Sequence, residues 1–494
     1  MRSIALALAV ATLPATAPAQ EIPWERHNRI AGDLGRQARY REAETEYRRA
    51  LSEAEASGRP EAVFTVRNNL ATVFHQQGRY QEAEDGYRRA LESSRGTPNK
   101  LRASVMHNLG ELSKTAGRAR EAGDWLRQAL ESKRREPEMD PPDVAVTLAS
   151  LADLARLEQN DLQAGRLAAE AIAMLDRAGR SHSSQMAQAR NLLGLIEMAR
   201  GRYREATSLF ASARDLWEVT RGPEHPDVAI AINNLGAVHK AKGRYFDAAR
   251  LTRRALRIWE NALGPEHPQV AAALTNLSDQ ELLQSRAEQA ESHARRAVRI
   301  LESRPGPAHP GLPVALLQLA ETVRLTGRDR EAEAIYQRSL ELMRAPDGEE
   351  GPRTASVMNS LGVLAYERGQ MGDAERWLRQ ALDRQQRRHG AGHVETTIPL
   401  ANLGAVYLAH GRLDHAEPVL ARALAVREEL LGAEHPLTAS CAMLYSEALR
   451  KLGRTREAAA LSARGRAILD RHARENLMHH TIRAADILGW RPRR

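Results

Sequence analysis

Cysteine and aromatic residues are scarce in this sequence of 494 residues. Cys441 is its one cysteine, so no disulfide can form within the chain. Aromatic residues make up 4 % of the sequence, and much of the apolar content is alanine and leucine, which favour helices. The composition disfavours a β-sandwich or an α/β enzyme, and the fold must gain its stability from packing without cross-links.

Long apolar runs are also missing. The clearest run, residues 4–13, is about ten residues long, whereas a membrane-spanning helix needs roughly 18. This run follows Arg2 and precedes the small residues Ala17 and Ala19, which is the layout of a secretory signal peptide. We therefore expect residues 1–19 to be a signal peptide and the mature chain to be exported to a bacterial periplasm or secreted, with no membrane span.

Lysine is rare, with 6 among the 72 basic residues. The formal net charge is +9, and loss of residues 1–19 removes one basic residue, Arg2, which leaves +8. The excess is mild and forms no dense basic block. Together with export, this predicts no nucleic-acid partner and at most a weak preference for acidic peptide segments.

Motifs that carry catalysis are absent. The sequence has no H-E-x-x-H, G-x-S-x-G or S-x-x-K motif, and no Gly-Lys dipeptide for a phosphate-binding loop. A lone cysteine within a predicted helix, Cys441, is more often a small buried residue than a nucleophile. We expect no enzymatic activity, no catalytic residues and no cofactor.

The chain is instead built from a repeat. A Gly-Arg turn followed by an acidic residue and alanine recurs, as in Gly78-Arg79 with Glu82-Ala83, and from Gly201 to Gly453 every step is 42 residues. Weaker copies at Ala38 and Asn160, and one at Ser285, bring the total to about eleven units. Such self-similarity indicates a stack of identical supersecondary units.

The residue pattern within each unit predicts a helical hairpin. In residues 225–264, apolar residues fall at helical spacing on both sides of Gly243. Gly243 stands where a helix end needs a positive φ, and Pro226 stands in the first turn of a helix, where a missing N–H costs nothing. The pattern predicts a helix, a tight turn and a second helix.

Residues at fixed offsets resemble the tetratricopeptide repeat. In that unit they are Leu235, Gly236, Tyr245, Ala248 and Ala255, and other copies carry Ala43, Tyr47 and Ala50, Ala83, Tyr87 and Ala90, or Ala206, Phe210 and Ala213. The 42-residue period and the Gly-Pro-Glu-His-Pro linkers at 222–226 and 264–268 resemble the kinesin light chain subclass. The resemblance implies an all-α right-handed solenoid over residues 20–472. Residues 473–494 form a charged tail, which we expect to cap the C-terminal end of the stack. The resemblance also implies that extended peptides bind the concave surface formed by the first helices.

One polar column stands out on the predicted concave surface. Asn69, Asn108, Asn234, Asn276 and Asn402 occupy the same position in their units. A primary amide offers two donors and one acceptor, so a column of amides suits a peptide backbone of any sequence. The resemblance implies peptide binding here, with Lys114, Lys240 and His75 nearby; alternatively, each asparagine bonds a neighbouring hairpin or faces solvent.

The linker histidines 225, 267, 309, 393 and 435 recur in register but are expected to be helix-start residues. Neighbouring hairpins lie about 8–10 Å apart, too far for shared metal coordination at about 2 Å, so we expect no metal site. The sequence therefore favours a non-catalytic scaffold that binds protein or peptide partners in its groove. The alternative is a structural or self-associating component of an envelope assembly, and the oligomeric state stays open.

Overall fold

The computed structural model describes residues 22–92, 99–136, 140–158, 160–303, 309–343 and 354–476. In these ranges the chain forms 22 α-helices and one short 3₁₀ segment, and it forms no strand. The expected signal peptide, residues 1–19, and residues 477–494 lie outside the described part.

Most helices have between 13 and 19 residues. They are α1 (Pro23–Arg36), α2 (Tyr40–Ala56), α3 (Pro60–Gln76), α4 (Tyr80–Glu92), α5 (Asn99–Thr115), α6 (Ala119–Arg135), α7 (Pro141–Leu157), α8 (Asp161–Arg177), α9 (Ser184–Ala199), α10 (Tyr203–Arg221), α11 (Pro226–Ala241), α12 (Tyr245–Leu263), α13 (Pro268–Leu282), α14 (Ala287–Glu302), α15 (Leu312–Leu325), α16 (Asp329–Leu342), α17 (Thr354–Glu367), α18 (Met371–His389), η1 (Val394–Thr396), α19 (Thr397–Ala409), α20 (Leu413–Leu431), α21 (Pro436–Lys451) and α22 (Thr455–Asn476).

Consecutive helices pair into hairpins, each with an odd-numbered first helix and an even-numbered second helix. The predicted turn glycines have φ between 70° and 85°, a region open to glycine at little cost; they are Gly78, Gly117, Gly201, Gly243, Gly327, Gly369, Gly411 and Gly453. Ala38 and Ser285, the substitutes for glycine, take the same conformation with φ of 59° and 58°. The predicted repeat of helix, tight turn and helix is confirmed.

Small residues let the two helices of a hairpin approach closely, as the repeat pattern predicts. Ala83 and Ala206 are fully buried, and Tyr87 and Phe210, four residues further on, are at most 1 % exposed. Gly404 of α19 lies against Leu420 of α20, and a Cβ placed on this glycine would come within 2.5 Å of Leu420 Cγ. The fold is therefore held by close contact between small and large side chains.

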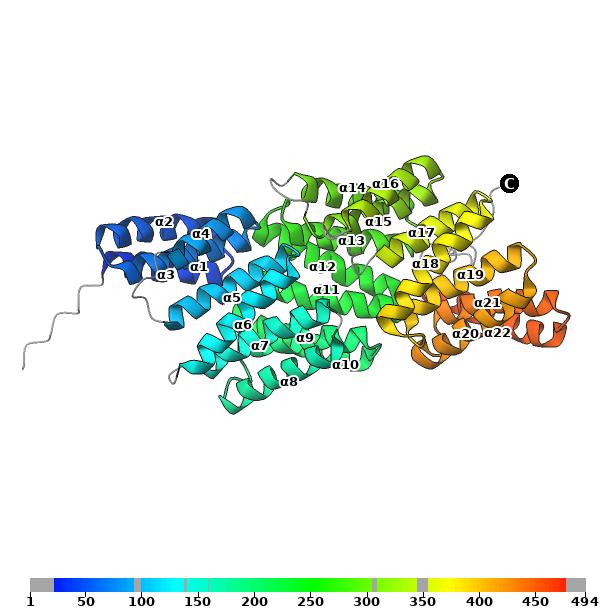
Figure 1. Cartoon of the computed structure of the whole chain (residues 1–494), viewed down its shortest axis with the longest axis horizontal. Coiled ribbons are helices and arrows are strands. Elements are labelled where there is room, and N and C mark those ends of the chain that lie inside the picture. Colours follow the sequence, from blue (N-terminus) through cyan, green and yellow to red (C-terminus); the bar gives the residue numbers. More distant parts are fainter. Residues whose placement is uncertain are drawn as a thin grey trace, which may run out of the picture.

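The hairpins stack into an all-α solenoid, as the sequence predicts (Figure 1). In Figure 1 the cyan helices α5–α8 lie low in the view and the green helices α13–α16 lie above them, because the stack of hairpins coils. The final helix, α22, continues to Asn476 and so includes the first four residues of the expected tail. None of the helices in the described ranges has the length and apolarity needed to cross a membrane.

Hairpins five apart in the sequence touch one another. Gln76, in the second hairpin, contacts His267 at the start of the seventh, and a Cβ on Gly117, in the third, would lie 3.2 Å from Pro310 Cγ in the eighth. Ala199 and Ala241 meet residues of the tenth and eleventh hairpins in the same way. One superhelical turn therefore takes about five hairpins, and successive turns are in contact.

Candidate functional site

The predicted asparagine column forms a ladder between neighbouring hairpins. Each of the five side chains donates an amide N–H to an asparagine of the preceding hairpin: Asn69 to Asn28 (3.0 Å), Asn108 to Asn68 (2.9 Å), Asn234 to Asn191 (2.9 Å), Asn276 to Asn233 (3.1 Å) and Asn402 to Asn359 (2.8 Å). All five are half-buried. This geometry fits the alternative in which the asparagines join hairpins, and peptide binding by them stays a prediction.

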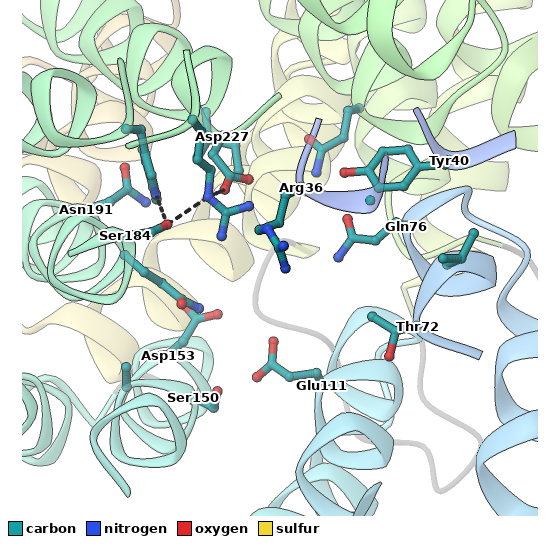
Figure 2. Close-up of a pocket in the computed structure, with 18 of the residues that line it drawn as sticks. Arg36, Tyr40, Thr72, Gln76, Glu111, Ser150, Asp153, Ser184, Asn191 and Asp227 are labelled. Atoms are coloured by element: carbon teal, nitrogen blue, oxygen red, sulfur yellow. Dashed lines mark hydrogen bonds and ion pairs between the residues drawn. The ribbon is translucent and has the colours of Figure 1, made fainter. Parts of the chain in front are cut away.

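A cavity of about 720 Å³ opens on the concave side of the first five hairpins; we call it the chamber. Its wall comes mainly from the first helices α1, α3, α5, α7 and α9, with contributions from α2, α10, α11 and α13. Of the five predicted asparagines, Asn69 lines the chamber. Figure 2 shows the labelled side chains around an open centre, with Thr72 and Gln76 across from Ser184 and Asn191.

Three glutamine amides face the chamber without an internal partner. Gln76, Gln188 and Gln269 line it, are exposed to solvent, and make no side-chain hydrogen bond to any described residue. They come from the second, fifth and seventh hairpins and occupy different positions in their helices. No common register links them in the sequence, and the coiling of the solenoid is what brings them to one cavity.

The chamber floor carries an ion-pair network between α5 and α7. Lys114 Nζ lies 2.9 Å from Glu111 Oε1 and 3.0 Å from Asp153 Oδ2, and Arg156 lies 2.7 Å from Asp153. Burial opposes ionisation, but the Lys114 ammonium dominates, so the pKa of Glu111 is lowered and that of Asp153 falls to about 2. The charged side chains of the floor are therefore paired with one another. This part of the chamber suits a ligand segment that carries little net charge.

Two histidines beside this network give a testable pH dependence. Burial lowers the pKa values of His75 and His107 to about 4, from 6.5 in an unfolded chain. Below pH 6.5 the unfolded state therefore binds more protons, so the stability present above that pH is lost as pH falls from about 6.5 to about 4. We expect a loss on the order of 2 kcal/mol between about pH 7 and pH 5, allowing for solvent screening.

Urea unfolding followed by circular dichroism at several pH values measures this loss. Glutamine at both positions retains a group that can bond Thr115 and Thr147, the present partners of His75 and His107, but it does not titrate. The double variant His75→Gln/His107→Gln should lose distinctly less stability over that pH range. Equal pH dependence in both proteins would contradict the assignment.

The opposite wall of the chamber is held by Ser184. Its hydroxyl accepts hydrogen bonds from Trp217 Nε1 (3.2 Å) and Arg221 Nε (2.8 Å), and Arg221 lies 3.3 Å from Asp227 (Figure 2). Asp227 belongs to α11, at the start of the second superhelical turn. These bonds join the two helices of the fifth hairpin to each other and to the start of the sixth hairpin. They therefore order the wall where the first superhelical turn passes into the second.

The linker histidines stand at helix starts, as predicted. Four of them are the N-cap residue of the next helix, and His309 lies two residues before Gly311, the N-cap of α15. Each Nδ1 accepts a backbone N–H two residues later, at 3.0 to 3.2 Å; the five are His225, His267, His309, His393 and His435. Three of them also reach across to the previous superhelical turn. Nε2 of His267 lies 3.0 Å from the Gln76 carbonyl, that of His393 3.1 Å from Ala199, and that of His435 2.9 Å from Ala241.

These second contacts determine the tautomer and were not foreseen from the sequence. A carbonyl can only accept, so Nε2 must carry the hydrogen while Nδ1 accepts in the cap. Each ring thus joins two turns about 190 residues apart. The described residues contain no group of three His, Cys, Asp or Glu side chains suited to hold a metal ion.

Comparison with known families agrees with this geometry. A tetratricopeptide repeat model matches residues 26–96, 185–251, 227–303, 280–345, 311–387, 353–429 and 396–471, which is more than half of the chain. The chain belongs to the tetratricopeptide repeat family. In the described residues this tetratricopeptide repeat protein forms eleven hairpins. Helices α5–α8 lie outside the matched residues but form hairpins of the same kind.

The solved structure of a Rap protein shares the fold of this tetratricopeptide repeat protein. A Rap protein complexed with Competence and Sporulation Factor matches with a TM-score of 0.54 and 13 % identity, over 76 % of this chain and 99 % of its own. BtubC (BKLC) from P. vanneervenii matches with a TM-score of 0.36 and 21 % identity, over 47 % of this chain and 94 % of its own. A comparison with curated protein sequences finds no match.

Proposed function

We propose that this chain is a non-catalytic scaffold that binds partner proteins through its concave surface. The observation that carries the proposal is the chamber of about 720 Å³, which is lined by the first helices and by polar groups that remain available to a ligand. Tetratricopeptide repeats serve as protein interaction scaffolds, and the Rap structure, which has this fold, was solved in complex with a factor. Fold alone does not set the ligand, so the side chains of the chamber carry the argument.

The chemistry of the wall supports a peptide as the ligand. Amides and hydroxyls, including Asn69, Gln188 and Ser184, alternate with apolar groups such as Leu192 and Ile230. Amides can bond the N–H and C=O groups of a peptide backbone, and the apolar groups can cover its side chains. Because the charges of the floor are paired with one another, the chamber should have at most a weak preference for acidic segments.

We further propose export of the mature chain to the periplasm or beyond the cell. The apolar run within residues 1–19 supports a signal peptide. The 42-residue period and its Gly-Pro-Glu-His-Pro linkers support a place in the kinesin light chain-like subclass.

Partner capture followed by titration tests the scaffold. Immobilised chain from residue 20 onward would capture a partner from an envelope extract of the source organism, and calorimetry would then measure the affinity. We expect alanine at Asn69, Asn108, Asn234, Asn276 and Asn402 together to weaken binding about tenfold or more if these amides contact the ligand, since each lost bond costs about 1 kcal/mol.

The matched control is Arg120→Ala/Arg330→Ala, two exposed side chains on second helices, with helicity of all variants checked by circular dichroism. The control should bind as the natural chain does. Equal affinity of the asparagine variant would mean that the ladder only joins hairpins. A large oligomer whose size does not depend on concentration, seen by light scattering with no partner captured, would favour the alternative role as a structural envelope component.

A further inference from the structure

The second superhelical turn closes the side of the chamber. Gln76 and Gln269 both line it, and between them the His267 ring bonds the Gln76 carbonyl at 3.0 Å. Tyr40 lies near enough to Asp227 and Arg221 for their charges to act on its hydroxyl, whose pKa is raised chiefly by burial. The first superhelical turn is thus in direct contact with the seventh hairpin at Gln76, which closes the groove from the side at this point.

The size of the chamber limits its occupant. At about 720 Å³ it matches the pockets of roughly 300–1,000 Å³ that take small ligands. A folded domain of about 100 residues has a radius of gyration of about 13 Å, far larger than this space. Only a few residues of extended chain fit, and their backbone N–H and C=O groups then need partners in the wall.

Resting on the proposed function, we infer that the chamber takes a free chain end of a partner, which enters along the superhelical axis. Gln76, Gln188 and Gln269 hydrogen-bond the backbone of that segment. Because Gln269 comes from the second turn, the site is complete only when the turns are in contact. The His267 bond therefore both assembles the site and blocks entry from the side.

Two peptide libraries distinguish a free end from a sideways approach. Short random peptides displayed with a free end, and the same peptides closed into a loop by a disulfide, would be selected on the natural chain. We expect enrichment from the free-ended library alone. Equal enrichment of closed loops would overturn axial entry and leave the proposed function intact, whereas no enrichment from either library would overturn both.

Affinity for an enriched synthetic peptide tests the glutamines. The variant Gln76→Ala/Gln188→Ala/Gln269→Ala should bind it about tenfold more weakly or worse, because up to three hydrogen bonds are lost. All three side chains are exposed, so the fold should be unaffected, and Arg120→Ala/Arg330→Ala serves as the control. Unchanged affinity in the glutamine variant would overturn their assignment.

Association kinetics test the closed wall. Asparagine at position 267 keeps a helix-capping oxygen but is too short to reach the previous turn. His267→Asn should therefore bind the peptide with a several-fold higher association rate and should admit closed loops, while X-ray scattering shows a looser coil. An unchanged rate, with closed loops still excluded, would overturn the role of the wall as a barrier to entry.

Discussion

Replacing Arg324 by methionine is expected to lower the free energy of unfolding by about 3–5 kcal/mol, because the change leaves two carboxylates without their cation in the packed interior. The Arg324 side chain is 8 % exposed and lies 3.0 Å from Glu321 and 2.5 Å from Glu367, which are 25 % and 11 % exposed. Ser360 also bonds Glu321. The cluster joins the eighth and ninth hairpins.

The pH dependence of the variant should reverse in sign. In the natural chain burial opposes ionisation, but Arg324 holds the pKa of Glu321 below its ordinary 4.5, so the stability it contributes is lost as pH falls below about 4.5. Without the guanidinium, burial raises the folded-state pKa of the Glu321 carboxyl. The folded variant then binds more protons, and its stability should rise as pH falls toward 4.5.

Two controls isolate the cause of this loss. Methionine in place of Arg376, which is 62 % exposed and paired with Asp373, should cost less than about 1 kcal/mol. Methionine at Arg324, Glu321 and Glu367 together should recover most of the stability, because no unpaired charge remains buried. Urea denaturation measures all four proteins, and a loss below about 1 kcal/mol for the single Arg324 variant would contradict the proposed electrostatic cause.

Valine in place of Gly404 should cost about 3 kcal/mol. A Cβ on Gly404 would lie 2.5 Å from both Cγ and Cδ2 of Leu420, and Leu420 is fully buried, so neither helix of this hairpin can yield without losing packing elsewhere. Hydrogen exchange should show the loss concentrated in α19 and α20, because repeat proteins couple chiefly to their nearest neighbours.

Gly372 provides the matched control. It lies in α18, is exposed, and has nothing within 4 Å of a built Cβ. Valine there should change stability by no more than about 0.5 kcal/mol. Leu420→Ala combined with Gly404→Val should recover part of the loss, since the deleted methyl groups make room. Equal effects of valine at both glycines would show that helix propensity, and not the close approach, determines the cost.

Local features of the fold were predictable because they depend on short stretches of chain. Gly243 and its equivalents reveal the turns through their need for positive φ, and Pro226 reveals a helix start. Ala83 and Tyr87 reveal the buried face of a second helix. Each of these signals operates within one hairpin, so a repeat of 42 residues was enough to predict helices, turns and their stacking.

The candidate site was predictable only in part. The sequence places Asn69, Asn108 and the other asparagines in one register, but it does not show that each donates to the hairpin before it. That partner depends on how far one hairpin is rotated against the next. Peptide binding by the column stays a prediction.

The sequence by itself determined an all-helical stack of about eleven hairpins, because helix periodicity and turn chemistry repeat within every unit. Only the tertiary structure decided that His267 meets Gln76 and that Gln188 and Gln269 share one chamber. Small rotations between neighbouring hairpins add up over five units, and their sum sets which distant residues touch. No local pattern encodes that sum, since it arises from the packing of every interface along the coil.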